Sequence, residues 1–146
     1  MRVRYAAGIA LVVAMFAPLA GPLSAQTTMK KIAPPLKGPI EVGYDMSAKR
    51  EGDKIVTVFH VKNLSATGSI IGLQIDQFFY DKSGNPQQGT GDRQRVKTPI
   101  NPGEVVTITL TSNTVPGMQS PQHKFSYRDG TVKPKLMKGL VPTKTS

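Results

Sequence analysis

The stretch from Ile70 to Asn85, IIGLQIDQFFYDKSGN, most constrains what this 146-residue chain can fold into. Successive side chains of a β-strand point to opposite faces, so a period of two here produces an almost unbroken apolar row on one face. That row consists of Ile71, Leu73, Ile75, Gln77 and Phe79. Gly72 and the many β-branched and aromatic residues argue against a helix. We therefore predict the central strand of a small β-sandwich.

Two acidic residues of this stretch have different expected roles. Asp76 lies in the middle of the opposite face, where alternation predicts that it faces solvent. Asp81 begins a tight polar turn and is expected to accept hydrogen bonds from nearby backbone amides. Gly84 can adopt a positive φ, and Pro86 cannot occupy a central position of a sheet ladder.

The rest of the chain shows the same alternation in short segments separated by turn residues. Strands are predicted over residues 40–47, 54–63, 92–98, 104–111, 123–129 and 131–136, in addition to the first stretch. Pro102-Gly103 suits a type II turn, and Asp129-Gly130 suits a two-residue hairpin turn. The pattern predicts an immunoglobulin-like antiparallel β-sandwich of six or seven strands.

The first 25 residues have the three parts of a secretory signal peptide: Arg2 and Arg4, an apolar run, and the small-residue exit Leu23-Ser24-Ala25. The apolar run is too short to span a bilayer, so no transmembrane span is expected after cleavage, and an uncleaved anchor is the alternative. The chain contains no cysteine, which excludes disulfides and a lipoprotein attachment site. We predict a periplasmic or secreted bacterial protein with a Pro/Lys-rich arm at residues 26–39, a sandwich domain at 40–137 and a basic tail at 138–146.

The formal net charge of the chain is +10, and it is +8 without Arg2 and Arg4. Such a charge attracts polyanions, although it also maintains solubility. In an extended segment Arg93, Arg95 and Lys97 project from one face at intervals of roughly 6.5 to 7 Å, and Lys133 and Lys135 do likewise. These rows predict contact with an anionic cell-envelope polymer or an envelope protein.

An alternative interpretation of the basic rows is that charged edge strands prevent sheet-to-sheet aggregation. Both rows lack the interleaved aromatic side chains that stack on bases, so nucleic acid is not an expected partner. We find no Gly-x-Ser-x-Gly elbow and no phosphate-binding glycine loop leading into a helix, so neither an enzyme nor a cofactor is expected. A binding or structural module without catalysis is the predicted class.

A second hypothesis is a periplasmic copper carrier. His60, His123 and Met118, with Met46, offer the soft ligands that copper prefers. Their spacing follows no metal motif, and methionine in a sandwich commonly fills the core.

The run VTVFHVKNLSATGSIIGLQIDQFFYDKSGNP, followed by PINPGEVVTITL, resembles the FxLYD-type exported bacterial domains. Val61 and Asn63 match the first part of the family pattern, residues 78–81 and Gly84 the second, and Pro102-Gly103 the third. Phe79 stands where the family has leucine, and the likeness covers about residues 54–110. The resemblance implies an immunoglobulin-like, non-catalytic domain, and it transfers no site residue.

Overall fold

The structure, a computed structural model, describes residues 29–143, and the compact unit considered below begins at Lys31. The predicted signal peptide, residues 26–28 of the arm and residues 144–146 of the tail lie outside the described residues. Every regular element in the described part is a β-strand, which confirms the predicted all-β class. No helix that could cross a membrane occurs among these residues.

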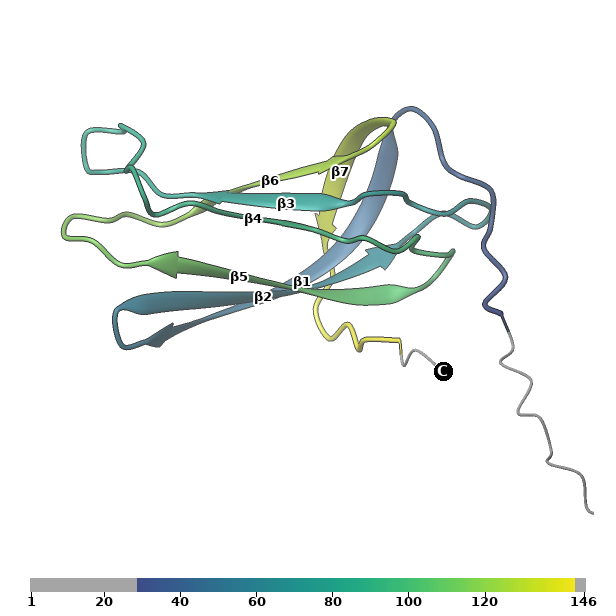
Figure 1. Ribbon diagram of the computed structural model, residues 1–146, viewed down its shortest axis with the longest axis horizontal. Helices are drawn as coiled ribbons and strands as arrows, with labels where there is room; N and C mark the ends of the chain where they lie inside the picture. The colour runs from purple at the N-terminus through teal and green to yellow at the C-terminus, as the bar shows by residue number, and fades with distance from the viewer. Residues whose placement is uncertain (1–28, 144–146) are drawn as a thin grey trace, which may run out of the picture. The chain divides into compact units, whose positions relative to one another are not determined.

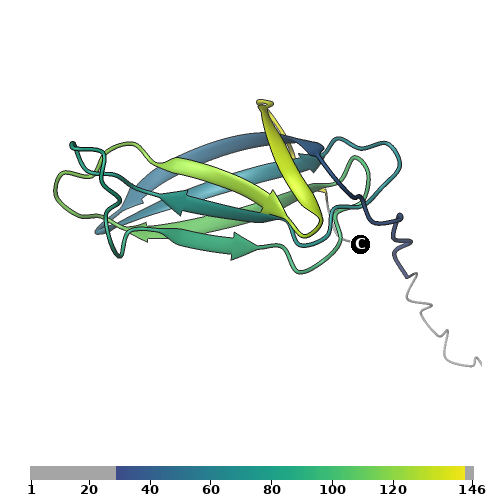
Figure 2. The same cartoon turned by 90° about the horizontal axis from the view of Figure 1, so that it is seen from above.

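Seven strands form two facing layers joined through one shared strand (Figures 1 and 2). The strands are β1 (Ile40–Glu51), β2 (Lys54–Asn63), β3 (Gln74–Phe78), β4 (Asp92–Arg95), β5 (Val105–Asn113), β6 (Gln122–Tyr127) and β7 (Gly130–Leu136). Their order in the sheet is β4-β3-β6-β7-β1-β2-β5. One layer contains β4, β3 and β6, the other contains β1, β2 and β5, and β7 connects the two. The two edge strands are therefore β4 and β5.

The pairing is antiparallel with one exception. β7 pairs with β6 only through Ser126 and Tyr127, and it then runs parallel to β1 from the pair Ile40–Val132 to the pair Tyr44–Leu136. The prediction of an antiparallel sandwich is thus correct except for β1 and β7. The exception arises because β7 leaves β6 after two residue pairs and joins the other layer beside β1. β1 and β7 begin at the same end of the sandwich, so they run in the same direction.

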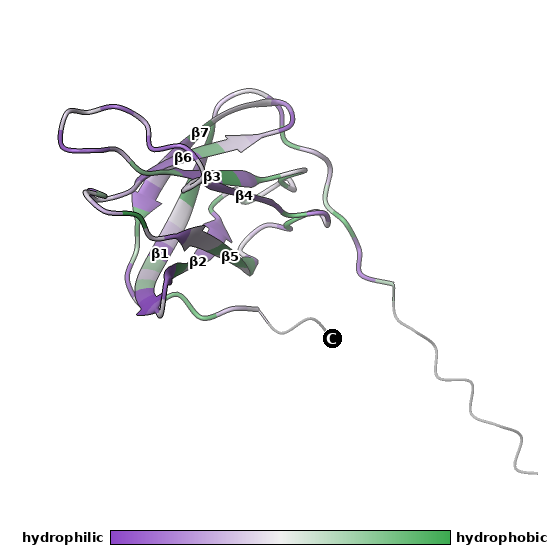
Figure 3. Cartoon of the chain, turned by 60° about the vertical axis from the view of Figure 1, so that its left-hand side comes forward, coloured by the Kyte–Doolittle hydropathy of each residue, from purple (hydrophilic) through white to green (hydrophobic). Residues whose placement is uncertain are grey.

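The hydrophobic core lies between the two layers. Its fully buried apolar members, none of which exposes any surface, are Val42, Phe59, Val61, Ile70, Leu73, Ile75, Ile100 and Leu110. Figure 3 shows how hydrophobic and hydrophilic residues alternate along the strands that supply them. Phe59 packs against the rings of Tyr44 and Phe125, with ring centroids 6.2 and 5.7 Å away. The chain has no disulfide, so this apolar burial is the main source of stability.

The stretch from Ile70 to Asn85 has the predicted inner face but not the predicted length. Leu73, Ile75, Gln77 and Phe79 are all buried, whereas Ile71, the first member of the predicted row, is only half-buried. The prediction of one long strand is wrong, because β3 covers only Gln74–Phe78 and Gly72 has a φ of 67°. That left-handed residue turns the chain, so Ile70 also enters the core.

Asn63, at the end of β2, fixes the loops at one end of the sandwich. Its side-chain amide donates hydrogen bonds to the carbonyls of Gly68 and Ile100, each at 2.8 Å, and its Oδ1 accepts one from the amide of Ser65 at 3.0 Å. Asn63 is 1 % exposed, and these bonds satisfy a polar group that would otherwise be costly to bury.

The first and the last described segments both pack against the sandwich. In the predicted arm, the amide of Leu36 donates to the carbonyl of Ser69, and the amide of Ser69 donates to the carbonyl of Pro34, each at 2.8 Å. In the C-terminal segment, defined here as residues 137–143, the amides of Met137 and Thr143 donate to Tyr44 and Val105. This segment therefore runs from β1 to the first residue of β5.

Gly43 makes room for that segment. A Cβ atom at this position would lie 2.4 Å from Sδ of Met137. Gly43 lies between the inward-facing Val42 and Tyr44, so Met137 packs on the outer side of the β1–β2–β5 layer.

Candidate anion-binding face

The outer side of the β4–β3–β6 layer collects polar and cationic side chains. Ile75 and Gln77 of β3 point inward, so the residues between and beside them point outward. We call this surface the basic face; its outward positions are Gln74, Asp76, Phe78, Arg93, Arg95, Gln122, Lys124 and Ser126. The register places Arg93, Asp76 and Lys124 in one cross-strand row and Arg95, Gln74 and Ser126 in the next.

Arg93 forms an ion pair with Asp76 across the β4–β3 pairing. Nε of Arg93 donates to Oδ1 of Asp76 at 2.5 Å, and the side-chain amide of Gln74 donates to the same oxygen at 3.0 Å. Asp76 is only 5 % exposed, which corrects the prediction that it faces solvent. It occupies the outward side of β3 as expected, but the side chains of Arg93 and Gln74 cover it.

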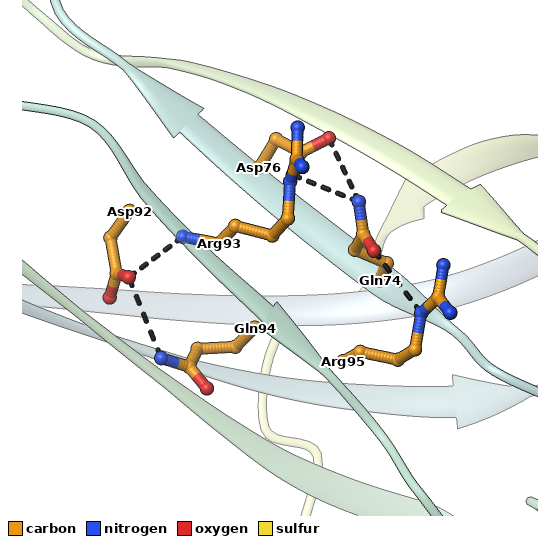
Figure 4. Close-up of polar contacts among 6 residues, drawn as sticks. All are labelled: Gln74, Asp76, Asp92, Arg93, Gln94 and Arg95. Atoms are coloured by element: carbon orange, nitrogen blue, oxygen red, sulfur yellow. Dashed lines mark hydrogen bonds and ion pairs between the residues drawn. The ribbon is translucent and has the colours of Figure 1, made fainter.

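Arg95 is held in the same way one position further along β4. Its Nε donates to Oε1 of Gln74 at 3.2 Å, so the Gln74 amide connects the two arginines through Asp76 (Figure 4). The terminal guanidinium nitrogens of Arg93 and Arg95 make no hydrogen bond or ion pair within residues 29–143. The contacts at Nε therefore restrict both side chains and leave their ends available for a carboxylate or a phosphate.

The second predicted row, on β7, lies on the same side of the sheet, and two strands separate it from β4. Thr131 of β7 is opposite the outward Ser126, so Lys133 and Lys135 alternate with the half-buried Val132 on the outward side. Lys133 Nζ lies 3.4 Å from Oε1 of Glu41, which offsets its charge. β3 and β6 separate this row from β4, so the structure does not merge the two rows into one.

Two further positions complete the account of the basic residues. Lys97 is exposed, but it follows the end of β4 at Arg95 and is outside the strand that was expected to carry it. Lys124 of β6 lies on the basic face beside Asp76 and was not among the predicted binding residues. Its alternation with Phe125, which packs on the core, is the signal that could have identified it.

Phe78 is the one aromatic side chain among the outward positions of β4, β3 and β6. It ends β3 and is 38 % exposed. Beside it is a shallow hollow of about 330 Å³, which is lined by Asp76, Gln77, Phe78, Gly91, Asp92 and Arg93.

The residues of the copper hypothesis are not brought together. Nδ1 of His60 lies 3.1 Å from Oγ1 of Thr107 on the outer side of β2 and β5. The ring of His123 packs edge-on against the inward-facing Phe59 at 4.9 Å, so the two imidazoles lie on opposite sides of β2. Met118 belongs to the β5–β6 loop. No group of three or more His, Asp or Glu side chains suited to a metal ion occurs within the described range.

His123 instead begins an internal chain of polar contacts. Its Nε2 lies 2.8 Å from Oε1 of Gln77, and Nε2 of Gln77 donates to Oγ of Ser112 at 2.8 Å. Burial lowers the pKa of His123, because the apolar surroundings disfavour the charged imidazolium. The chain joins β6, β3 and β5 across the interior.

Asp81 has the predicted turn role. Its Oδ1 accepts hydrogen bonds from the backbone amides of Asn85 and Ser83, at 2.9 and 2.8 Å. The bond from Asn85 is the main cause that lowers the pKa of Asp81, since it favours the ionised carboxylate.

No protein-family model matches the chain, and no curated protein is significantly similar to it. Its function is therefore inferred from the geometry of the basic face.

Proposed function

We propose that this protein is an exported, non-catalytic binding module of the bacterial envelope, which holds an anionic polymer or an acidic envelope protein against its basic face. The observation that carries this proposal is the arrangement of Arg93 and Arg95. Both guanidinium groups are held through Nε by Asp76 and Gln74, and both present their remaining nitrogens outward.

This arrangement lowers the cost of binding. A free arginine side chain loses rotamer freedom when it binds an anion, and a side chain that is already restrained loses less. Lys124 adds a third cation in the row of Arg93 and Asp76. The resemblance to FxLYD-type domains, and the signal peptide expected at residues 1–25, are the reasons to place the module in the envelope.

The proposal is tested by titrating the purified protein with polygalacturonate and with polyphosphate at low and at physiological salt. We expect binding that weakens as salt increases, because exposed charges are screened. The double variant Arg93→Gln/Arg95→Gln should bind about tenfold more weakly or worse, since it removes two charge-assisted contacts.

Lys49→Gln/Arg50→Gln is the matched control. It removes the same charge from two exposed residues of β1, away from the basic face. Its affinity should stay within about threefold of the unmodified protein, because only long-range attraction changes. Absence of binding by the unmodified protein, or an equal loss in the control, would refute the proposal. Circular dichroism establishes that each variant is folded.

A further inference from the structure

The surroundings of Phe78 indicate what kind of anion the basic face accepts. On the β6 side, Phe78 is opposite Gln122. On the β4 side, Gln77 is opposite Asp92, so the position facing Phe78 is Gly91. Gly91 has no side chain, and a Cβ there would lie 3.0 Å from the carbonyl oxygen of Gln77. The side of the Phe78 ring that faces β4 is therefore uncovered, and the hollow of about 330 Å³ occupies this space.

The lining of the hollow combines two chemistries. The ring of Phe78 supplies a flat apolar surface, and Arg93 supplies guanidinium nitrogens without a protein partner among the described residues. Asp92 also borders the hollow, but its carboxylate is held at the edge of β4 that faces β5. Its Oδ1 accepts from the amide of Arg93 at 2.7 Å and from Nε2 of Gln94 at 3.5 Å, and its Oδ2 accepts from the amide of Thr111 at 2.7 Å. The groups that face the hollow are therefore Phe78 and Arg93.

We propose that Phe78 and Arg93 form a subsite for one sugar unit of an acidic polysaccharide, an inference that rests on the proposed function. The C–H face of the sugar packs on the Phe78 ring, and its carboxylate pairs with Arg93. The volume of the hollow is at the lower end of the range for small-molecule sites, which suits one sugar ring.

The same lining disfavours single-stranded nucleic acid. Proteins that bind such strands stack successive bases on several aromatic side chains, whereas the outward positions of β4, β3 and β6 include one.

The test compares four probes: polygalacturonate, neutral dextran, polyphosphate and single-stranded oligothymidine. We expect Phe78→Leu to weaken polygalacturonate binding about tenfold, the size of an aromatic contact, and to leave polyphosphate binding unchanged. Phe78→Tyr keeps the ring and should retain the affinity. Met46→Ala is the matched control, since Met46 is 41 % exposed on β1 and should not affect either probe.

The outcomes separate this inference from the proposed function. If no anionic probe binds the unmodified protein, both fail. If Phe78→Leu binds polygalacturonate normally while Arg93→Gln/Arg95→Gln does not, the sugar subsite alone is refuted. Oligothymidine binding that depends equally on Phe78 would overturn the assignment to a polysaccharide. Leucine preserves the apolar packing of Phe78, and thermal unfolding shows whether each variant keeps its fold.

Discussion

The two edge strands of the sheet, β4 and β5, differ in how their unpaired backbone edges are protected. β4 has four residues, of which Asp92, Arg93 and Arg95 are charged. β5 has nine residues and no charged side chain. The β5 edge is instead covered at two points: Thr111 donates its amide to Asp92, and Val105 exchanges hydrogen bonds with Thr143 of the C-terminal segment. Between these points, the outward backbone groups of Thr107 and Thr109 have no partner within residues 29–143.

This difference bears on the two interpretations of the arginines. Charges on an edge strand discourage aggregation, and a longer exposed edge needs more protection than a shorter one. Here the longer edge strand, β5, has no charged side chain, whereas the shorter one, β4, has three. The comparison favours a binding role for Arg93 and Arg95 over edge protection.

The largest expected effect is that of uncovering the β5 edge. Ending the chain at Leu136 removes the packing of Met137 on Gly43 and the hydrogen bonds to Tyr44 and Val105. We expect the free energy of unfolding to fall by about 3 kcal/mol, and the protein to self-associate. Urea unfolding and sedimentation measure both effects. Thr143→Val, which removes only the side-chain acceptor of the Val105 amide, should cost no more than about 1 kcal/mol. A stable, monomeric truncated protein would show that the segment does not guard this edge.

The next effect distinguishes the structural from the binding role of Arg93. Arg93→Met leaves the covered carboxylate of Asp76 with only the Gln74 amide, and should lower the free energy of unfolding by about 1 kcal/mol. Asp76→Asn/Arg93→Met should recover most of that loss without recovering anion binding. Thr109→Met on β5 is the counterpart and should change stability little. Denaturant unfolding measures the stability of these three variants, and polygalacturonate titration measures their affinity. Recovery of binding in Asp76→Asn/Arg93→Met would argue against direct contact between Arg93 and the anion.

A smaller effect concerns the polar chain that connects β3 to β5. Because the pKa of His123 is lowered in the folded protein, the unfolded chain takes up a proton first as the pH falls below the ordinary value of 6.5. Stability should therefore be highest above about pH 6.5 and decrease until the folded-state pKa is passed. Thermal unfolding between pH 8 and pH 5 measures this slope. His123→Gln should flatten it, and an unchanged slope would assign the dependence to other groups.

The smallest expected effect comes from moving charge to the other edge. Thr107→Lys/Thr109→Lys adds two cations to β5, a charge change equal in size and opposite in sign to that of Arg93→Gln/Arg95→Gln. If affinity for anions follows the local geometry of the basic face, it should change by less than about twofold at physiological salt, where charges farther apart than about 8 Å are largely screened. A gain equal to the loss in Arg93→Gln/Arg95→Gln would indicate that net charge alone governs binding.

Local chemistry predicted most of the fold. Alternation identified all seven strands, and the turns at Asp81 and Pro102-Gly103 have the expected hydrogen bonds, including that from the Glu104 amide to the Asn101 carbonyl. These features depend on residues that are close together in the sequence, so they can be predicted from one sequence.

The features that were predicted wrongly depend on contacts between segments that are distant in sequence. The break at Gly72, the parallel β1–β7 pairing and the burial of Asp76 each depend on segments distant in sequence. The predicted candidate site was incomplete for the same reason. It included Arg93 and Arg95, but Gln74, Phe78 and Lys124 gain their relevance only from the register of β3 between β4 and β6. Cross-strand register cannot be read from alternation alone, because each strand is consistent with several partners.

The position of β7 has a consequence for how the chain acquires its fold. β7 comes last in sequence among the seven described strands, yet it lies in the middle of the sheet, where it joins β6 to β1. The two halves of the sheet therefore cannot be joined before β7 is available. In a chain that leaves a narrow exit with its N-terminus first, this junction would form only after β7 has passed, in a step of high contact order.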